Sequence, residues 1–499
     1  MKTMLKRGAG LLMPIFSLPS PYGIGTFGKE AYDFIDQLKE ARQTYWQVLP
    51  MGPTSYGDSP YQSFSAFAGN PYFIDLDTLK KEELLTQEEI DACYWCDEAD
   101  EVKYDTIYYY RFPLLKKAFA RSTHQKTKEY KAFLKENEYW IEDYSLFMAL
   151  KKQFKDKAWL EWEEDIRLRK PEAVARWSRE LAEETDYWKF LQYKFFEQWK
   201  KLKAYAVEQK IQIVGDIPIY VALDGADVWS HPEQFQLDEV NLTPVNVAGV
   251  PPDAFSEDGQ LWGNPLYAWD KMEEDGFDWW KRRMKASAAL YDVIRIDHFL
   301  GVVQYYSIPY GSKDAKGGKW NEGPGRKLTD AITEAIGETK IIAEDLGVFC
   351  QGVKDLLKVT GFPGMKVIEF AFGGDRMNEH LPHCYEPNMV VYGGTHDNET
   401  IVGYFDPKKE KWWELQFVAD YLGVTHQSEV PDKVFRAAYG SVASVAIFQM
   451  QDVLRLDNRA RMNTPGEVGA NWKWRMKKGQ FGKEQEEYLA KLVDVFGRF

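Results

Sequence analysis

Residues 292–299, DVIRIDHF, are the stretch that best defines the fold. The run is short, β-rich and apolar, and it ends in polar side chains, as a buried parallel strand does when it reaches a rim of functional loops. Alternation along a strand places Arg295 and Asp297 on one face, with the two isoleucines and His298 on the other. We therefore expect Asp297 at the carboxyl end of a strand, where barrel enzymes build their active sites.

Seven further runs of this kind lie on either side of it, separated by segments of helical periodicity. Strands that alternate with helices predict an α/β protein with a parallel sheet. Because open doubly wound sheets more often stop at five to seven strands, a total of eight favours a TIM (β/α)8 barrel. The other expected strands are residues 12–18, 45–49, 211–217, 340–343, 365–370, 389–392 and 444–449.

The spacing of these runs is uneven, which predicts two insertions. Residues 80–209, between the second and third strands, are rich in Glu, Lys, Trp and Tyr at helical spacing and predict a mainly helical insertion. Residues 220–285, between the third and fourth strands, contain a long Pro- and Gly-rich part with no helical or strand period. We expect this segment to form a substrate-binding loop subdomain with an active-site lid. No clean linker divides residues 1–499, so one catalytic barrel domain is predicted.

Composition excludes several classes of protein. A net charge of -14 and a pI near 5.2 argue against nucleic-acid binding, which needs basic patches. No apolar run has the length of a transmembrane helix, so no membrane partner is expected. Four scattered cysteines and the lack of a signal-peptide cleavage site predict a cytoplasmic protein, or a plastid one if a plant transit peptide has been removed. The sequence leaves the oligomeric state open.

Two short motifs resemble cofactor or metal sites, but each lacks its essential partner. The glycines of residues 23–28, GIGTFG, have the spacing of a dinucleotide-binding loop, yet the following strand ends without the acidic residue that would hold a ribose. Cys93 and Cys96 have neither a second cysteine pair nor nearby histidines. We therefore expect no cofactor and no metal. The high aromatic content, 15%, instead points weakly towards carbohydrate.

Three expected strands deliver acidic residues to the same rim of the barrel. Asp297 ends one strand, Glu344 follows a second in IAEDLG, and Asp397 follows a third in GGTHDNET. A retaining glycosidase uses one carboxylate as nucleophile and a second as acid and then base, with carboxyl groups about 5 to 5.5 Å apart. Asp297 and Glu344 fit this pair, and Asp397 fits a group that binds ring hydroxyls and stabilises positive charge.

The chain resembles the 4-α-glucanotransferases, the amylomaltases or disproportionating enzymes of the α-amylase clan. The motifs that carry the resemblance are SPYGIGTFG, YGDSPYQSFSAFAGNPY, GDIPIYV, GVPPDAFSEDGQLWGNP, IRIDHF, IAEDLG, GGTHDNET and NTPGEVGANWKWR, which extend from the first expected strand to the last helix. The resemblance implies that Asp297 is the nucleophile, Glu344 the general acid/base and Asp397 the transition-state stabiliser. It also implies transfer of a 1,4-α-D-glucan segment to the 4-OH of an acceptor.

The same resemblance implies a set of sugar-binding residues and a lid. Residues 250–265 match a mobile loop that arches over the glucan. The expected partners are α-1,4-glucans and maltooligosaccharides. The implied substrate-binding residues are Arg295, His298, His396, Asp216, Ser59, Tyr61, Gln260, Trp262 and Asn471.

Two other functions remain open at this stage. An α-glucan hydrolase of the same clan would use the same three acids, because the catalytic residues alone do not decide whether water or a sugar resolves the intermediate. A non-catalytic glucan-binding protein on a degenerate barrel is the third alternative. The presence of Asp297, Glu344 and Asp397 argues against it.

Overall fold

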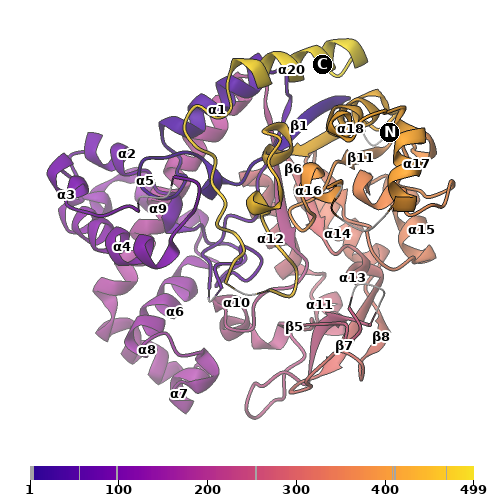
Figure 1. Cartoon of the computed structure of the whole chain (residues 1–499). Coiled ribbons are helices and arrows are strands. Elements are labelled where there is room, and N and C mark those ends of the chain that lie inside the picture. The colour runs from indigo at the N-terminus through magenta and orange to yellow at the C-terminus, as the bar shows by residue number, and fades with distance from the viewer. Residues whose placement is uncertain are drawn as a thin grey trace.

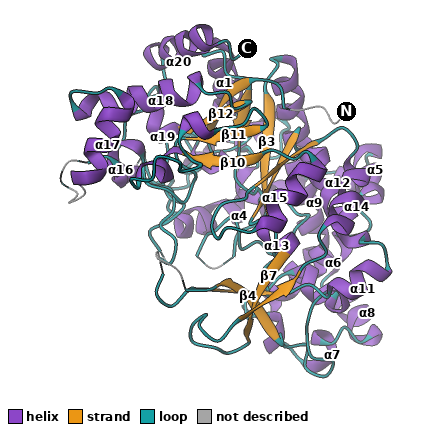
Figure 2. Cartoon of the chain, turned by 90° about the vertical axis from the view of Figure 1, so that its right-hand side faces the viewer, coloured by secondary structure: helices purple, strands orange, loops and turns teal. Residues whose placement is uncertain are grey.

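Eight parallel strands form a barrel that is nearly closed, which confirms the predicted TIM-barrel fold. In the computed structural model, which describes residues 5–55, 57–96, 99–252, 256–406, 408, 412–467 and 469–499, the strand order is β10-β11-β12-β1-β2-β3-β6-β9. At the two edges, the amide of Ala343 donates to the carbonyl of Pro363, next to β10, at 3.0 Å. Figure 2 shows β3, β10, β11 and β12 of this barrel grouped together. The strands are β1 (Gly8–Leu12), β2 (Tyr45–Gln47), β3 (Gln212–Pro218), β6 (Val293–Asp297), β9 (Lys340–Ala343), β10 (Gly364–Val367), β11 (Met389–Tyr392) and β12 (Val445–Gln449).

Seven of the predicted strands overlap a strand of the structure, although residues 368–370 of the predicted strand 365–370 belong to a 3-10 helix, η6 (Ile368–Phe372), but the first is wrong. The strand occupies Gly8–Leu12, and the predicted residues 12–18 instead contain Pro14 and a short 3-10 helix, η1 (Ile15–Ser17). The reason is steric. A Cβ atom on Gly10 would lie 2.5 Å from the carbonyl oxygen of Tyr45 on the neighbouring strand, so this strand needs glycine where β-branched residues would normally signal it.

Amphipathic helices cover the barrel. In α14, the side chains of Leu328, Ile332 and Ile336 recur every four residues and are all buried, which is the pattern of a helix with one face against a core. None of the described helices combines the length and apolar character needed to cross a membrane. The helices that flank the barrel strands are α1 (Lys29–Glu40), α12 (Asp278–Leu290), α13 (Leu300–Val303), α14 (Arg326–Ile336), α15 (Gln351–Thr360), α16 (Ile401–Tyr404), α17 (Trp412–Leu422), α18 (Val430–Gly440), α19 (Met450–Val453) and α20 (Lys483–Phe496).

Helices also fill the chain between β2 and β3, where the sequence predicts its helical insertion. Figure 1 shows them grouped on one side of the barrel. The longest, α9 (Ala182–Glu208), packs against β3 and α6 (Ile141–Gln153), and its Trp199 is almost fully buried, so part of the aromatic surplus serves helix packing. These helices are α2 (Leu76–Lys81), α3 (Gln87–Asp91), α4 (Tyr104–Arg121), α5 (Lys128–Glu136), α6 (Ile141–Gln153), α7 (Glu164–Arg167), α8 (Pro171–Glu180) and α9 (Ala182–Glu208).

A second, antiparallel sheet stands apart from the barrel and was not predicted. Its strand order is β5-β4-β7-β8, and Figure 2 shows part of it below the barrel strands. Two of its strands belong to the segment for which the sequence predicts no strand period, and two follow β6. The strands are β4 (Asn246–Val250), β5 (Gln260–Pro265), β7 (Gln304–Pro309) and β8 (Lys319–Glu322), accompanied by helices α10 (Ala226–Ser230) and α11 (Trp269–Glu274).

The pattern of this sheet is hidden in the sequence for a physical reason. The register between β4 and β5 shifts between Val247 and Gly249, so alternation of side chains is interrupted. Gly249 allows close backbone approach, since a Cβ there would lie 2.2 Å from the carbonyl oxygen of Gln260. Within the expected lid, residues 250–265, positions 253–255 lie outside the described residues, and Gln260–Pro265 form β5.

Candidate active site

The carboxyl ends of β6 and β9 bring two acidic residues to the same end of the barrel. Asp297 is the last residue of β6, and Glu344 directly follows β9, its paired neighbour. The amide of Glu344 donates to the carbonyl of Ile296 at 3.0 Å, and the amide of Phe299 donates to the carbonyl of Glu344 at 3.0 Å. The ladder thus continues past both acids and holds their backbones beside one another.

Arg295 joins two carboxylates in a buried ion network. Its Nη1 atom donates to both oxygens of Asp216, at 2.7 Å each, and to Oδ1 of Asp297 at 2.9 Å. The side chains of Arg295 and Asp216 are 3% and 0% exposed, whereas that of Asp297 is 28% exposed. Burial alone lowers the pKa of Arg295, but the two carboxylates raise it by more, so the guanidinium stays charged. One accessible carboxylate, Asp297, is thereby oriented by a charge-assisted hydrogen bond.

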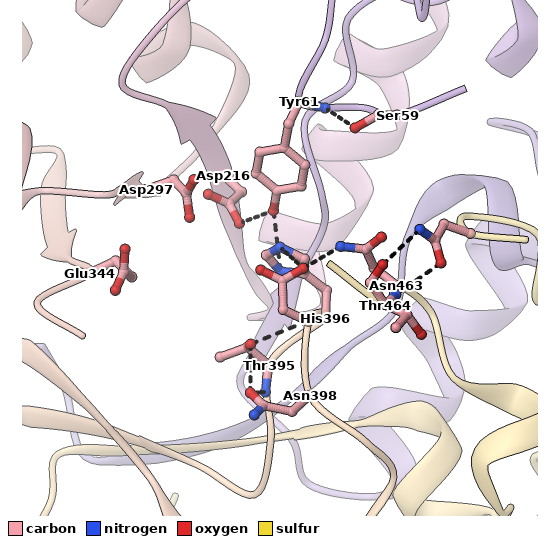
Figure 3. A network of polar contacts seen from close by, with 12 residues as sticks. Ser59, Tyr61, Asp216, Asp297, Glu344, Thr395, His396, Asn398, Asn463 and Thr464 are labelled. Atoms are coloured by element: carbon pink, nitrogen blue, oxygen red, sulfur yellow. Dashed lines mark hydrogen bonds and ion pairs between the residues drawn. The ribbon is translucent and has the colours of Figure 1, made fainter. Parts of the chain in front are cut away.

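Tyr61 extends this network towards the segment that follows β11. Its hydroxyl donates to Oδ2 of Asp216 at 2.8 Å and lies 3.2 Å from Nδ1 of His396, as Figure 3 shows. The rings of Tyr61 and His396 are stacked with centroids 4.8 Å apart. Trp472 packs on both rings, at 5.7 and 5.9 Å. The sequence reasoning did not single out Trp472, although it lies within the quoted motif NTPGEVGANWKWR.

Glu344 occupies a different environment. The backbone amides of His298 and Leu346 donate to its two carboxyl oxygens at 2.7 and 2.8 Å. Burial, and secondly the negative charge of Asp297, raise the pKa of Glu344 to about 8. This carboxyl group is therefore protonated at neutral pH and can donate a proton.

His298 presents a neutral imidazole beside this acid. Its backbone adopts a left-handed conformation, with φ at 52°, directly after the strand end. Burial lowers the pKa of His298 to about 4. Its buried Nε2 atom has no hydrogen-bond partner among the described residues. Trp262 meets the imidazole edge to face at 4.8 Å, so a sugar hydroxyl bound here would find both a hydrogen-bonding nitrogen and an aromatic wall.

Asp397 is oriented by a residue that the sequence reasoning missed. Its Oδ1 atom accepts a hydrogen bond from Nδ2 of Asn463 at 2.5 Å and lies 3.3 Å from Nε2 of His396. Arg461 donates to its backbone carbonyl at 2.5 Å. Asn463 opens the motif NTPGEVGANWKWR, which was the only sequence signal for this contact.

The remaining predicted ligands lie at the margins of this network. Ser59 accepts a hydrogen bond from the amide of Tyr61 at 3.3 Å. Gln260 accepts one from Nε1 of Trp262 at 3.0 Å. Asn471 is different, because its amide is engaged three times within its own loop, with the backbone of Thr464 (2.9 and 3.1 Å) and of Glu467 (2.8 Å). In this structure Asn471 therefore shapes the loop, and its role as a sugar ligand stays a prediction.

The charged side chains of this site are held by hydrogen bonds and ion pairs within the protein. Within the part of the chain that the structure describes, no group of three or more His, Cys, Asp and Glu side chains is placed to hold a metal ion. Asp297 accepts a hydrogen bond from Arg295, and Glu344 accepts one from the backbone amide of His298. The site therefore presents the oriented side chain of Asp297 beside the protonated carboxyl group of Glu344. Such a pair can carry out acid-assisted displacement at a glycosidic carbon.

Comparison with known proteins agrees with this geometry. A family model described as 4-alpha-glucanotransferase, glycoside hydrolase family 77, matches residues 13–480. A 4-alpha-glucanotransferase of Clostridium butyricum is 49% identical, covering 97% of this chain and 100% of its own length. One from Streptococcus pneumoniae (strain ATCC BAA-334 / TIGR4) is 46% identical, covering 99% and 98%.

A solved structure extends the similarity to three dimensions. The amylomaltase from Streptococcus agalactiae in complex with acarbose superposes with a TM-score of 0.95 at 41% identity, covering 99% of this chain and 100% of that one. Similarity at this level runs along the barrel and both insertions, so it is not confined to a shared barrel. The chain therefore belongs to the 4-alpha-glucanotransferase family and is a glucan transferase.

Proposed function

We propose that this enzyme disproportionates maltooligosaccharides through a covalent glucosyl intermediate on Asp297. The observation that carries the proposal is the contrast between two neighbouring carboxyl groups: Asp297 is oriented by Arg295, and Glu344 is buried and protonated at neutral pH. A retaining mechanism requires this division of roles.

In the first step, an oxygen of Asp297 attacks the anomeric carbon of the donor glucan, and the bond to the glycosidic oxygen breaks. Glu344 gives its proton to that leaving oxygen. In the second step, the 4-OH of an acceptor sugar attacks the glucosyl ester, Glu344 takes the proton of that hydroxyl, and Asp297 is released as a carboxylate. Asp397, held by Asn463, is placed to bind ring hydroxyls and to stabilise the positive charge that develops at the ring.

Transfer competes with hydrolysis for the same intermediate. Trp262 and Tyr61, which contact His298 and His396 respectively, supply apolar surface at the cleft that excludes water and orients an acceptor. The S. agalactiae amylomaltase binds acarbose, an oligosaccharide, and by similarity we assign α-1,4-glucans and maltooligosaccharides as substrates here. The names of the curated relatives likewise favour transfer over hydrolysis.

The test is to incubate the pure protein with maltotriose alone. Chromatography should reveal glucose together with a ladder of longer maltooligosaccharides, while an assay of reducing ends on the same samples stays constant. Rising reducing ends without longer products would make the enzyme a hydrolase in practice. No change in the sugar at all would overturn the proposal.

We also propose that the enzyme works in the cytoplasm. The low cysteine content, four in 499 residues, is usual for a reducing compartment. Fractionation of the source cells, with the transferase assay applied to each fraction, tests this assignment. Activity confined to the medium or to an envelope fraction would contradict it.

A further inference from the structure

A second pocket lies outside the catalytic cleft, between the helical insertion and the segment that follows β3. Its volume is about 150 Å³. The pocket is formed where α6, α10 and the start of α12 approach each other; Figure 1 shows α6 and α10 as neighbours, and their residues are in contact. Six of its lining residues carry the argument below: Phe67, Tyr139, Trp140, Asp227, Gln234 and Trp279.

Aromatic rings make up much of its wall. The ring of Phe67 is stacked on that of Trp140 at 6.4 Å and meets Tyr139 and Trp279 edge to face at 5.4 and 5.9 Å. Phe67, Trp140 and Trp279 are 7%, 5% and 6% exposed, so these walls are fixed by packing before any ligand arrives. Rigid aromatic surfaces of this kind suit the C–H faces of a pyranose ring.

Polar atoms in the same pocket are buried without protein partners. Nε1 of Trp279 and Oε1 of Gln234 have no hydrogen-bond partner among the described residues. Both residues line the pocket, and a buried donor or acceptor that lacks a partner gains from a hydrogen bond to a ligand hydroxyl. Asp227, 5% exposed, accepts the amide of Ala66 at 2.8 Å, and burial raises its pKa to about 6. The pocket thus offers a donor, an acceptor and a carboxyl group beside its aromatic walls, and the charged or titratable side chains that also line it include Asp143, His231, Asp275, Asp278 and Arg282.

The size of the pocket fits one six-membered ring. An engineered protein cavity of about 150 Å³ binds benzene when its lining is purely apolar. Here the lining combines ring faces with hydrogen-bonding atoms, which selects a ring that carries hydroxyl groups. We propose that this pocket is a second carbohydrate site that binds one glucose unit, either free glucose or the end of a glucan. The choice of glucose rests on the proposed function.

The pocket shares a wall with the catalytic region. Ser65 and Phe67 line both this pocket and a smaller cavity, of about 60 Å³, that Tyr61 and Asp216 also line. The amide of Ala66 anchors the same loop to Asp227. A sugar bound in the second pocket therefore contacts the loop that carries Tyr61 to the catalytic network.

The experiment measures glucose binding in the full-length Asp297→Asn variant, which keeps the sugars intact, by calorimetry and saturation-transfer NMR. In that background Trp279→Phe removes the indole N–H and keeps an aromatic wall, so affinity at the second site should fall about 5- to 10-fold. Trp280→Phe is the matched control, because its Nε1 is also buried without a partner among the described residues but does not line the pocket. Binding in the control should be unchanged.

Binding measurements with maltotriose and with glycerol show which ligand the pocket prefers. Maltotriose binding that is weakened by Trp279→Phe identifies a glucan end as a ligand, whereas an effect on glucose alone identifies the free sugar. Equal glucose affinities for Trp279→Phe and Trp280→Phe, or glycerol binding as tight as glucose binding, would overturn the proposal. The two proposals can fail independently. If the enzyme forms longer maltooligosaccharides from maltotriose but Trp279→Phe leaves glucose binding unchanged, only the second site is refuted. If Trp279→Phe weakens glucose binding but no longer maltooligosaccharides form, only the proposed disproportionation is refuted.

Discussion

The two sides of the active site, at the ends of β6 and β9, show how carboxyl groups are given opposite tasks by their surroundings. On the β6 side, Asp297 meets the charged guanidinium of Arg295, which also holds Asp216. On the β9 side, the oxygens of Glu344 accept only the backbone amides of His298 and Leu346 in the described structure. Backbone amides orient a carboxyl group without supplying a full positive charge, and burial then keeps that group protonated. The difference lies in the neighbours and not in the acids.

The largest expected effect comes from removing the β6 carboxylate. Asp297→Asn should lower kcat on maltotriose by about 10⁴-fold or more, because no nucleophile remains, while circular dichroism stays unchanged. Asp292→Asn is the control, since Asp292 lies just before the opposite end of β6, where it accepts the amide of Ile213 at 2.8 Å. It should retain activity. If Asp297→Asn transferred glucan at nearly the rate of the unsubstituted enzyme, another residue would have to be the nucleophile.

The carboxyl group of Glu344, which follows β9, should set the pH dependence of kcat/KM. With its pKa raised from 4.5 to about 8, Glu344 is protonated below pH 8, so kcat/KM for maltotriose should fall as pH rises through about 8. Glu344→Gln should lower kcat by about 10²- to 10⁴-fold. Asp345→Asn is the control, because Asp345 accepts the amide of Met365 at 2.7 Å and should leave the basic limb in place. A flat profile from pH 7 to 10 would contradict the assignment.

The same group links pH to stability. Between pH 4.5 and about 8 the folded state holds a proton on Glu344 that the unfolded state has released. Its contribution to stability is therefore complete below about pH 4.5 and is lost as pH rises through about 8. We expect the Glu344→Gln variant to gain melting temperature relative to the unsubstituted enzyme between pH 5 and pH 9. Thermal melting of both proteins at the two pH values measures this difference.

A smaller effect should follow from Tyr61→Phe. The change removes the hydroxyl that donates to Asp216 and lies beside His396, but it retains the stacked ring. A hydrogen bond to a charged group contributes about 1.5–3 kcal/mol, so kcat/KM should fall roughly 10- to 100-fold. Tyr392→Phe is the control, since it removes a buried hydroxyl that donates to Gln47 at 2.8 Å. Equal losses in both variants would mean that the hydroxyl of Tyr61 has no particular role.

The smallest expected change concerns the ratio of hydrolysis to transfer. Trp262→Ala should open the cleft beside His298 to water, so that the ratio of new reducing ends to transferred glucosyl units rises while total donor cleavage changes little. Trp320→Ala, at a 36% exposed position on β8 of the same antiparallel sheet, is the control. An unaltered partition would show that Trp262 does not decide between water and acceptor.

Much of the barrel could be predicted because its signals are local. Parallel strands that are buried on both faces appear in the sequence as short apolar runs, and their carboxyl ends lie at one rim of the barrel. The same reasoning predicts Asp297, Glu344 and Asp397 at one rim of the barrel. It failed for β1, whose glycines give no strand signal, and for the antiparallel sheet, whose strands pair across the intervening β6.

The partners of the acids could not be predicted in the same way. Tyr61 and Asp216 are separated by 155 positions along the chain, and Tyr61 and His396 by 335. No periodicity links residues at such distances, and the contact between Asn463 and Asp397 is of the same kind. Such pairs become neighbours only when the whole barrel closes.

The sequence by itself determined the type of fold, the carboxyl chemistry and the family, because strand periodicity, residue type and motif order are properties of the linear chain. Only the tertiary structure decided which carboxyl group keeps its proton, since that depends on burial and on charges brought in from distant segments. The second pocket arises in the same way, from the meeting of α6, α10 and α12. Proton affinity and cavity shape are properties of a folded environment, and no single stretch of sequence contains them.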